Sequence, residues 1–381
     1  TLIFLKRSQT MIEELSFGPV PITCHSFNKD CSQLALSLNS NTVDIYKKSG
    51  QKWEKLQSLE EHSERVTSID WAANTDRIVT ASADRNAHVW TRDSTGQFRP
   101  TLVLLRIDRA ATVVKWSPLE NKFAVGSGAK LVSVCHFEPE HNWWVCKQIK
   151  KPFKSTVTCL AWHPNNCLLA VGATDFKARI VSAYLKEADE KPAATCWGGN
   201  MKFSNVMAEY TNGGSGWIRD VAFNGDGSLM AWVSHDSSVS VANGSTQTLA
   251  VLRFAMLPML TCCWLSDTAL VAAGHDCYPV VFRYEAGSAS LSIAGQLNMS
   301  ADQSGGSTKM TAKTMFGNMD RMATEDSVEK LTTVHQNSIN QLAVIVSDAS
   351  RVRRFSTVGV DGRLVVWDTD TIEQKVANLR I

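Results

Sequence analysis

A pattern of strand and turn residues recurs seven times along this chain of 381 residues. The clearest copy reads VTSIDWAANTDRIVTASADRNAHVW: one strand ends at Trp71, a second begins at Ile78, Asp84 lies in a turn, and a third strand ends at Trp90. In the same register, an apolar residue begins the second strand of each copy at Leu34, Ile78, Phe123, Leu169, Met230, Leu270 and Phe355. The turn position is occupied by Ser40, Asp84, Ala129, Asp175, Asp236, Asp276 and Asp361. Such a chain is constrained to stack seven similar units.

Successive turn positions are 44, 45, 46, 61, 40 and 85 residues apart. A period of about 40–45 residues with strand signals throughout is typical of WD repeats, each of which forms a four-stranded blade. The sequence therefore predicts an all-β, seven-bladed β-propeller of WD repeats. The expected blades lie near residues 20–60, 61–104, 105–150, 151–190, 214–252, 256–297 and 331–381.

Closing the ring requires one extra outer strand for the last blade, because an unpaired sheet edge is a liability. Either the N-terminal MIEELSF or the C-terminal KVANLRI could supply that strand, and the sequence leaves both open. The single propeller is expected to span residues 11–381. Residues 1–10 are expected to be a cloning or gene-model extension that takes no part in it.

Two intervals are longer than the period. The first contains EADEKPAATCWGGNMKFSNVMAEYTNGGSG, whose Pro and Gly residues predict an excursion between blades four and five. The second could accommodate an eighth blade, but residues 298–330 lack the alternating apolar pattern of strands. They are instead expected to form a partly helical insertion between blades six and seven.

The insertion carries an apolar stripe. In a helix over residues 311–322, Met315, Phe316, Met319 and Met322 fall on one face. About twelve residues are marginal for an isolated helix. Methionine suits adaptable protein-binding surfaces, so the stripe is predicted to enter a partner's apolar groove. Packing against the propeller's own side, or plain disorder, are the alternatives.

The basic run KQIKKPFK follows HNWWVC and contributes Lys150, Lys151 and Lys154 as candidate partner-binding residues. Aromatic residues beside lysines could bind nucleic acid or an acidic protein. Lys and Arg outnumber Asp and Glu only by 39 to 37, so an acidic protein surface is favoured and nucleic acid is not expected. The alternative is an ordinary solvated connection between blades three and four.

The chain shows no sign of catalysis. His62, Ser82, Asp84 and Trp90 could suggest a Ser-His-Asp hydrolase, but G-x-S-x-G is absent. A buried hydrogen-bond chain that locks strands together is the better interpretation. The same structural role is expected for the corresponding residues of other repeats: Asp175, Asp236, Asp276, Asp361 and Trp367.

Cofactors, metals and membrane spans are not expected either. There is no phosphate-cradling G-x-x-x-x-G-K-[ST] loop. The ten cysteines lie in apolar runs without C-x-x-C or zinc spacing, which indicates buried thiols in a reducing compartment. The longest apolar window, from Leu257, is interrupted by Pro258 and Asp267, which argues against a transmembrane helix.

Four segments go beyond generic WD-repeat positions: HNWWVCKQIKKPFKSTVTCLAWHPNN (141–166), RIVTASADRNAHVWT (77–91), AWVSHDSSV (231–239) and LVAAGHDCYPVVFRYE (270–285). They resemble the p41-Arc type of propeller subunit of the actin-related protein two/three complex, and the resemblance runs from about Pro19 to the C-terminus. It implies a non-catalytic scaffold in the cytoplasm, at the actin cytoskeleton, within the assembly that nucleates branched actin filaments.

The resemblance also implies partners. The propeller would pack against small helical subunits and lie near an actin-related subunit, and nucleation-promoting factors would reach the complex partly through it. The insertion would project as a helix towards the mother filament, and that helix maps onto Met310 to Met322 here. The alternative function is a stand-alone WD-repeat adaptor that recruits partners to a ligase or signalling complex.

Overall fold

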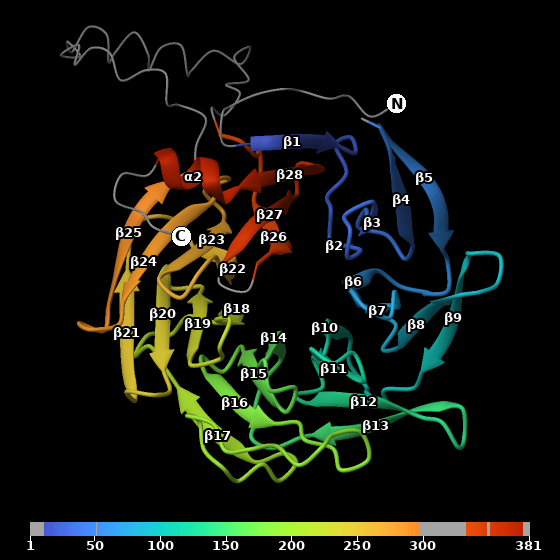
Figure 1. Cartoon of the computed structure of the whole chain (residues 1–381), viewed down its shortest axis with the longest axis horizontal. Coiled ribbons are helices and arrows are strands. Elements are labelled where there is room, and N and C mark those ends of the chain that lie inside the picture. The colour runs from blue at the N-terminus through green and yellow to red at the C-terminus, as the bar shows by residue number, and fades with distance from the viewer. Residues whose placement is uncertain (1–10, 51, 298–332, 349–350, 376–381) are drawn as a thin grey trace, which may run out of the picture.

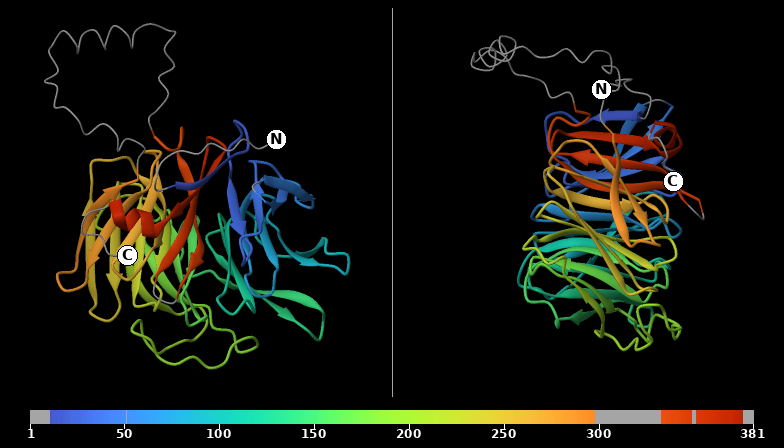
Figure 2. Two further views of the ribbon diagram at one scale, coloured as in Figure 1. Left: turned by 45° about the horizontal axis from the view of Figure 1, so that its top comes forward. Right: turned by 90° about the vertical axis from the view of Figure 1, so that its left-hand side faces the viewer.

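A ring of β-sheets makes up the molecule. The computed structural model describes residues 11–50, 52–297, 333–348 and 351–375. Their strands form seven four-stranded sheets, which stand like blades around a central axis (Figure 1). Seen from the side, the ring is a disc that is thinner along its axis than across it (Figure 2). The prediction of an all-β, seven-bladed propeller is confirmed.

The first six sheets each use four consecutive strands that run from the axis to the rim. The first two blades contain β2 (Cys24–Phe27), β3 (Gln33–Ser37), β4 (Val43–Ser49) and β5 (Lys52–Leu59), then β6 (Val66–Trp71), β7 (Ile78–Ser82), β8 (Ala87–Arg92) and β9 (Phe98–Val103). The third and fourth contain β10 (Ala111–Trp116), β11 (Lys122–Ser127), β12 (Val132–Glu138) and β13 (Trp143–Ile149), then β14 (Val157–Trp162), β15 (Leu168–Ala173), β16 (Ala178–Ser182) and β17 (Val206–Tyr210). The fifth and sixth contain β18 (Ile218–Phe223), β19 (Leu229–Ser234), β20 (Ser238–Asn243) and β21 (Thr248–Arg253), then β22 (Met259–Trp264), β23 (Ala269–Gly274), β24 (Val280–Glu285) and β25 (Ser290–Gln296).

The seventh sheet settles how the ring closes. It is built from β26 (Ile339–Ser347), β27 (Val352–Gly359), β28 (Arg363–Asp368) and the N-terminal β1 (Met11–Ser16). β1 pairs antiparallel with β28 at the rim, with Leu15 opposite Leu364 (Figure 1). Leu15 is buried in the cluster that joins the last blade to the first, so its burial favours the N-terminal segment as the closing strand. After β28 the chain enters the short helix α2 (Thr369–Lys375).

The excursion lies elsewhere than expected. The rim strand of blade four is β17, which pairs with β16, so the extra residues fall within blade four and not between blades four and five. Trp197 in this excursion is buried, donates its indole N–H to the Gly227 carbonyl at 2.7 Å, and packs against Tyr210 and Phe223. Trp197 therefore fixes the excursion against blade five and against β17, the strand that completes the sheet of blade four.

The innermost strands are bonded to one another around the axis. Each such strand has one edge with no ladder partner, and its backbone groups need other partners. Threonine hydroxyls supply some of them by donating to a carbonyl of the next blade: Thr67 to Ala111 at 2.9 Å, Thr112 to Val157 at 2.7 Å, and Thr158 to Ile218 at 2.6 Å.

Other inner-strand side chains accept hydrogen bonds from the next blade's backbone N–H. The acceptor and donor pairs are Ser26 with Trp71 (3.1 Å), Asp70 with Trp116 (2.7 Å), Asp220 with Cys262 (3.0 Å), Thr261 with Leu342 (3.1 Å) and Gln341 with His25 (2.8 Å). The last pair connects the seventh blade back to the first. The ring is therefore closed twice, by β1 at the rim and by side chains at the axis.

His25 is the centre of the axial closure. Its imidazole is buried, with Nδ1 2.9 Å from Gln341 Oε1 and Nε2 2.7 Å from Ser356 Oγ. Burial lowers the pKa of His25 from 6.5 to about 4, against the opposing effect of the Gln341 hydrogen bond. The neutral ring is therefore the form that joins the two blades at neutral pH.

This lowered pKa predicts acid sensitivity. The unfolded chain binds the proton more tightly than the folded one, so the contribution of His25 is complete above pH 6.5 and is lost as the pH falls towards about 4. We expect a loss of about 3 kcal/mol from this group over that range. Urea unfolding at several pH values should show a flatter pH dependence for His25→Gln. The matched change at exposed His141 should leave the pH dependence of the unfolding free energy as in the wild type. If this dependence were equal in all three proteins, the assignment of acid sensitivity to His25 would be contradicted.

Candidate partner-binding surface

A directional hydrogen-bond chain runs through blade two. Trp90 donates its indole N–H to Thr80 Oγ1 at 3.0 Å, and Thr80 Oγ1 lies 2.8 Å from His62 Nε2. His62 Nδ1 lies 2.8 Å from Asp84 Oδ2. Burial lowers the pKa of His62, so the neutral ring accepts from Thr80 and donates to Asp84. Each polar side-chain group in this hydrogen-bond chain has a partner. This is the condition for a buried hydrogen-bond chain to stabilise a sheet.

Ser82 is not a member of the chain, contrary to the simplest interpretation of its motif. Its hydroxyl donates to the backbone carbonyls of Glu64 and Arg65, at 2.8 and 3.0 Å. Ser82 is the last residue of β7, where its side chain meets the incoming connection and leaves the central position to Thr80. The His62 and Asp84 side chains are only 1% and 5% exposed, which gives a substrate no access to them.

Blade seven repeats this arrangement. Trp367 donates to Thr357 Oγ1 at 3.0 Å, His335 Nε2 lies 2.8 Å from the same oxygen, and His335 Nδ1 lies 3.0 Å from Asp361 Oδ1. Sequence reasoning identified Trp367 and Asp361 but missed His335 and Thr357. The signal was present in the spacing. His335 precedes Asp361 by 26 residues and Thr357 precedes it by 4, while His62 and Thr80 precede Asp84 by 22 and 4.

The remaining turn aspartates have different partners. Asp175 accepts two hydrogen bonds from the buried Arg179 guanidinium, at 3.0 and 2.8 Å. Asp236 accepts from the Asn212 amide and from Ser238 Oγ, the latter at 2.6 Å. Asp276 has its pKa raised by burial. The turn aspartate therefore bonds to histidine, to arginine, or to an amide and a hydroxyl in different blades, whereas Asp276 Oδ2 is buried without a hydrogen-bond partner among the residues that the structure describes.

The basic segment is exposed because its neighbours anchor it. Ile149 and Phe153 are buried in the core cluster shared by blades three and four. Lys150, Lys151 and Lys154 lie between and beside these anchors, in the connection from β13 to β14, and all three are exposed. None of the three forms an ion pair with any residue that the structure describes, in contrast to Lys147, which is 2.8 Å from Glu187.

Topology adds two cations to this segment. In an up-and-down sheet, the connection entering a blade and the turn between its second and third strands lie at the same end. Arg109, before β10, and Lys130, between β11 and β12, therefore share the end occupied by the basic segment, and both are exposed. Gly128 allows Arg109 to pack closely, because a Cβ there would lie 3.1 Å from Arg109 Cβ.

We call Arg109, Lys130, Lys150, Lys151 and Lys154 the basic surface. Sequence reasoning found only Lys150, Lys151 and Lys154, which are close in the sequence, since the other two are brought to the same end of the disc by the blade topology. Like charges at one end of a low-dielectric body raise the local concentration of an acidic partner. The surface can therefore attract and orient carboxylate-rich protein segments.

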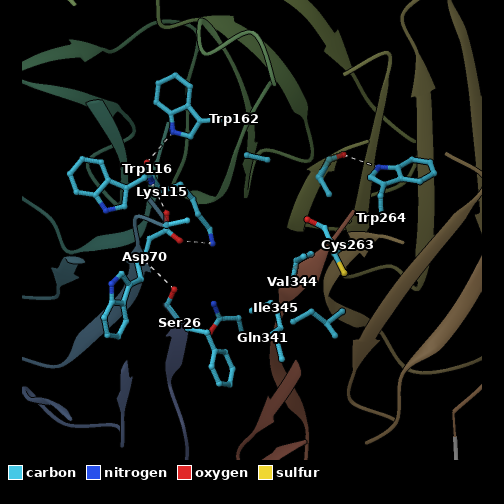
Figure 3. A pocket seen from close by; sticks show the side chains of 18 of the residues that line it. Ser26, Asp70, Lys115, Trp116, Trp162, Cys263, Trp264, Gln341, Val344 and Ile345 are labelled. Atoms are coloured by element: carbon cyan, nitrogen blue, oxygen red, sulfur yellow. Dashed lines mark hydrogen bonds and ion pairs between the residues drawn. The ribbon is translucent and has the colours of Figure 1, made fainter. Parts of the chain in front are cut away.

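The opposite end of the axis holds a cavity of about 790 Å³. Asp70, Lys115, Trp116 and Trp162 are among the residues that line it, and Figure 3 shows the ends of the Asp70 and Lys115 side chains facing each other. Three of them are engaged with one another across neighbouring blades: Asp70 Oδ1 is 3.6 Å from Lys115 Nζ, and Trp162 donates its indole N–H to the Lys115 carbonyl at 2.9 Å. The described part of the chain contains no group of three or more His, Cys, Asp or Glu side chains placed to hold a metal ion.

The apolar stripe of the insertion lies outside the described residues, and so do its candidate contacts Met310, Met315, Phe316, Met319 and Met322. Their role stays a prediction. Within the described ranges, no helix has the length and hydropathy that a bilayer crossing requires.

Comparison with known proteins agrees with this architecture. Residues 53–91 match the family of the WD domain, G-beta repeat, and residues 114–195 match the WD40 domain of anaphase-promoting complex subunit 4. The chain is thus a WD-repeat propeller whose distinguishing features are its loops and surfaces.

Relatives from three kingdoms define the family more narrowly. The chain is 51% identical to actin-related protein 2/3 complex subunit 1A-B of Xenopus laevis, over 95% of this chain and 97% of the relative. It is 38% identical to subunit 1 of Schizosaccharomyces pombe, over 92% and 97%, and 36% identical to subunit 1A of Arabidopsis thaliana, over 94% and 96%. The chain belongs to the family of actin-related protein 2/3 complex subunit 1, a non-catalytic family, as the sequence predicted.

The Thr80 hydroxyl provides a direct test of the polar chain. In Thr80→Val the Trp90 indole N–H and His62 Nε2 both lose their partner while the shape of the side chain is kept. We expect the free energy of unfolding to fall by about 1–3 kcal/mol. The matched change at Thr91, exposed on β8, should stay within about 0.5 kcal/mol of wild type. Equal urea midpoints for the two variants would contradict a stabilising chain.

Proposed function

We propose that this chain is the non-catalytic scaffold and binding subunit of an actin-related protein 2/3 complex, in the cytoplasm at the actin cytoskeleton. The observation that carries the proposal is the likeness to relatives named as subunit 1 over 95% of this chain and 97% of the relative. The fold supports it, because a closed ring with side-chain bonds between successive blades holds its end loops in fixed relative positions. Small helical subunits and an actin-related subunit are the expected neighbours.

The basic surface is proposed to bind an acidic protein segment, with nucleation-promoting factors among its partners. Its lysines carry no intramolecular ion pair within the described residues, so their charge is available to a partner. Arg109 and Lys130 lie at the same end of the disc and add to the field. Such charges act mainly on association rate and specificity.

The insertion is proposed to contact the actin filament. Its stripe has the spacing of a helix that enters an apolar groove, and Met310 precedes it as a further apolar contact. Full burial of four such side chains would stabilise a contact by roughly 1.5–3 kcal/mol each. A helix of about twelve residues is marginal on its own, so the stripe needs a partner's groove to supply that burial.

Membership of the complex is tested by size-exclusion chromatography of the native protein from a cell lysate, with mass spectrometry of its fraction. We expect elution in a stoichiometric assembly that contains two actin-related proteins. Elution near the 41.9 kDa of the chain alone, without those proteins, would contradict the proposal and favour a stand-alone WD-repeat adaptor.

The basic surface is tested by changing Lys150, Lys151 and Lys154 to Gln within the assembled complex. We expect affinity for an acidic activator to fall roughly tenfold at low ionic strength, and its salt dependence to become shallower, because three screened attractions are removed. The control changes Lys186, Lys191 and Lys202 to Gln, which are also exposed but lie in the excursion of blade four. If affinity depended on ionic strength equally in both triple variants, the basic surface would be ordinary solvated surface that binds no activator.

The insertion is tested by the double change Met315→Asp and Phe316→Asp in the complex. Charged side chains cannot enter an apolar groove without a large desolvation cost, so co-sedimentation with actin filaments should weaken. Circular dichroism should stay unchanged, since none of the strands in the seven described sheets contains either residue. Replacing the off-stripe residues Lys313 and Asn318 by Asp controls for added charge. Unaltered co-sedimentation of the Met315 and Phe316 variant would refute groove binding.

A further inference from the structure

Two thiols face each other across the rim hairpin of blade three. β12 and β13 pair antiparallel with Cys135 directly opposite Cys146. Their Sγ atoms are 2.7 Å apart, and both cysteines are free. The Sγ atoms need to approach by only about a further 0.7 Å to reach the length of a disulfide bond.

The two thiols differ in access. Cys135 is fully buried in the cluster that contains Trp116, Phe123 and Trp144. Cys146 is half-buried and lines a cavity of about 250 Å³ beside Trp143. Trp143 is 43% exposed, so this cavity lies at the surface of the disc, and a small solute reaches Cys146 before it reaches Cys135.

We propose that Cys135 and Cys146 form a redox-modification site whose oxidant is a small peroxide and whose product is a cross-strand disulfide. The Cys146 sulfur attacks one peroxide oxygen, the O–O bond breaks, and water leaves with the Cys146 sulfenic acid formed. The Cys135 sulfur then attacks Cys146 Sγ, the S–O bond breaks, and a second water leaves. Two thiols and one hydrogen peroxide thus give one disulfide and two waters, with the two electrons passing from the sulfurs to the peroxide.

The environment assigns these roles. Burial raises the pKa of Cys135 well above its ordinary value, and the hydrogen bond with Cys146 raises it further. Cys135 is therefore a thiol before the second step, and its proton passes to the departing hydroxyl as its sulfur bonds to Cys146 Sγ. It is a resolving thiol held against its partner, a position that favours disulfide formation over further oxidation of Cys146.

The pair differs from the other thiols of the chain. Cys262 and Cys263 are adjacent on β22, and neighbouring residues in a strand point to opposite faces, so they cannot pair with each other in the sheet. Cys196 is exposed in the excursion of blade four and provides a matched accessible thiol. The proposal is independent of the proposed function, although a disulfide would hold the strand that leads directly into Lys150.

The test uses the assembled complex that contains the full chain. After graded hydrogen peroxide, the protein is denatured, alkylated with N-ethylmaleimide and digested with trypsin. Both cysteines fall on one tryptic peptide, residues 131–147, in which both alkyl groups should be absent together after oxidation and both present when the sample is reduced with dithiothreitol before alkylation. Cleavage after Glu140 should then give two peptides that separate only on reduction.

Variants distinguish the two thiols. Cys135→Ser should stop at a sulfenic acid on Cys146 that dimedone traps, whereas Cys146→Ser should leave Cys135 alkylated at every dose. Cys196→Ser should leave the cross-strand disulfide unchanged. The proposal is overturned if the wild-type peptide carries oxidised Cys146 beside fully alkylated Cys135, or if neither thiol reacts at doses that modify Cys196. The wild-type peptide map decides the question even if a serine variant does not fold.

Discussion

The open inner edge of each blade is the constraint on which the rest of the structure depends. Seven inner strands meet around one axis, and none can add a further ladder neighbour there, so their backbone groups must find side chains instead. Thr67, Thr112 and Thr158 donate to the next blade, while Asp70 and Gln341 accept from it. Through these bonds, the inner strand of one blade satisfies backbone groups of the next blade. A ring of this kind therefore depends on bonds between blades as well as on the pairing of strands within each sheet.

Closure in turn determines what the ends of the disc can present. Buried anchors such as Ile149 and Phe153 tie a connecting segment to two blades at once, which leaves the lysines beside them pointing to solvent. The connection that enters blade two has a second role, because it carries His62, whose side chain is hydrogen-bonded to Thr80 within the sheet. The connections therefore combine two tasks, since one set of side chains locks adjacent strands and another forms a surface for partners.

The repeat pattern also explains which residues could be inferred before the structure. Asp84 and Trp90 recur with Asp361 and Trp367 at equal spacing, so both ends of the polar chains were visible. The central threonines were not, because Thr80 and Ser82 lie two residues apart on the same side of a strand and spacing cannot choose between them. That choice depends on which hydroxyl meets the incoming backbone, as Ser82 does.

The sequence by itself determined the number of blades, their register and the absence of a catalytic motif, because period and strand alternation are local properties that repeat. Only the tertiary structure decided that Met11–Ser16 closes the ring, that Val206–Tyr210 is the rim strand of blade four, and that Arg109 and Lys130 join the three lysines. Blade topology places the two exposed cations, and the two strand assignments have another physical reason. These assignments depend on contacts between segments far apart along the chain, such as Leu15 with Leu364, and the free energy of such contacts comes from burial that no local pattern records.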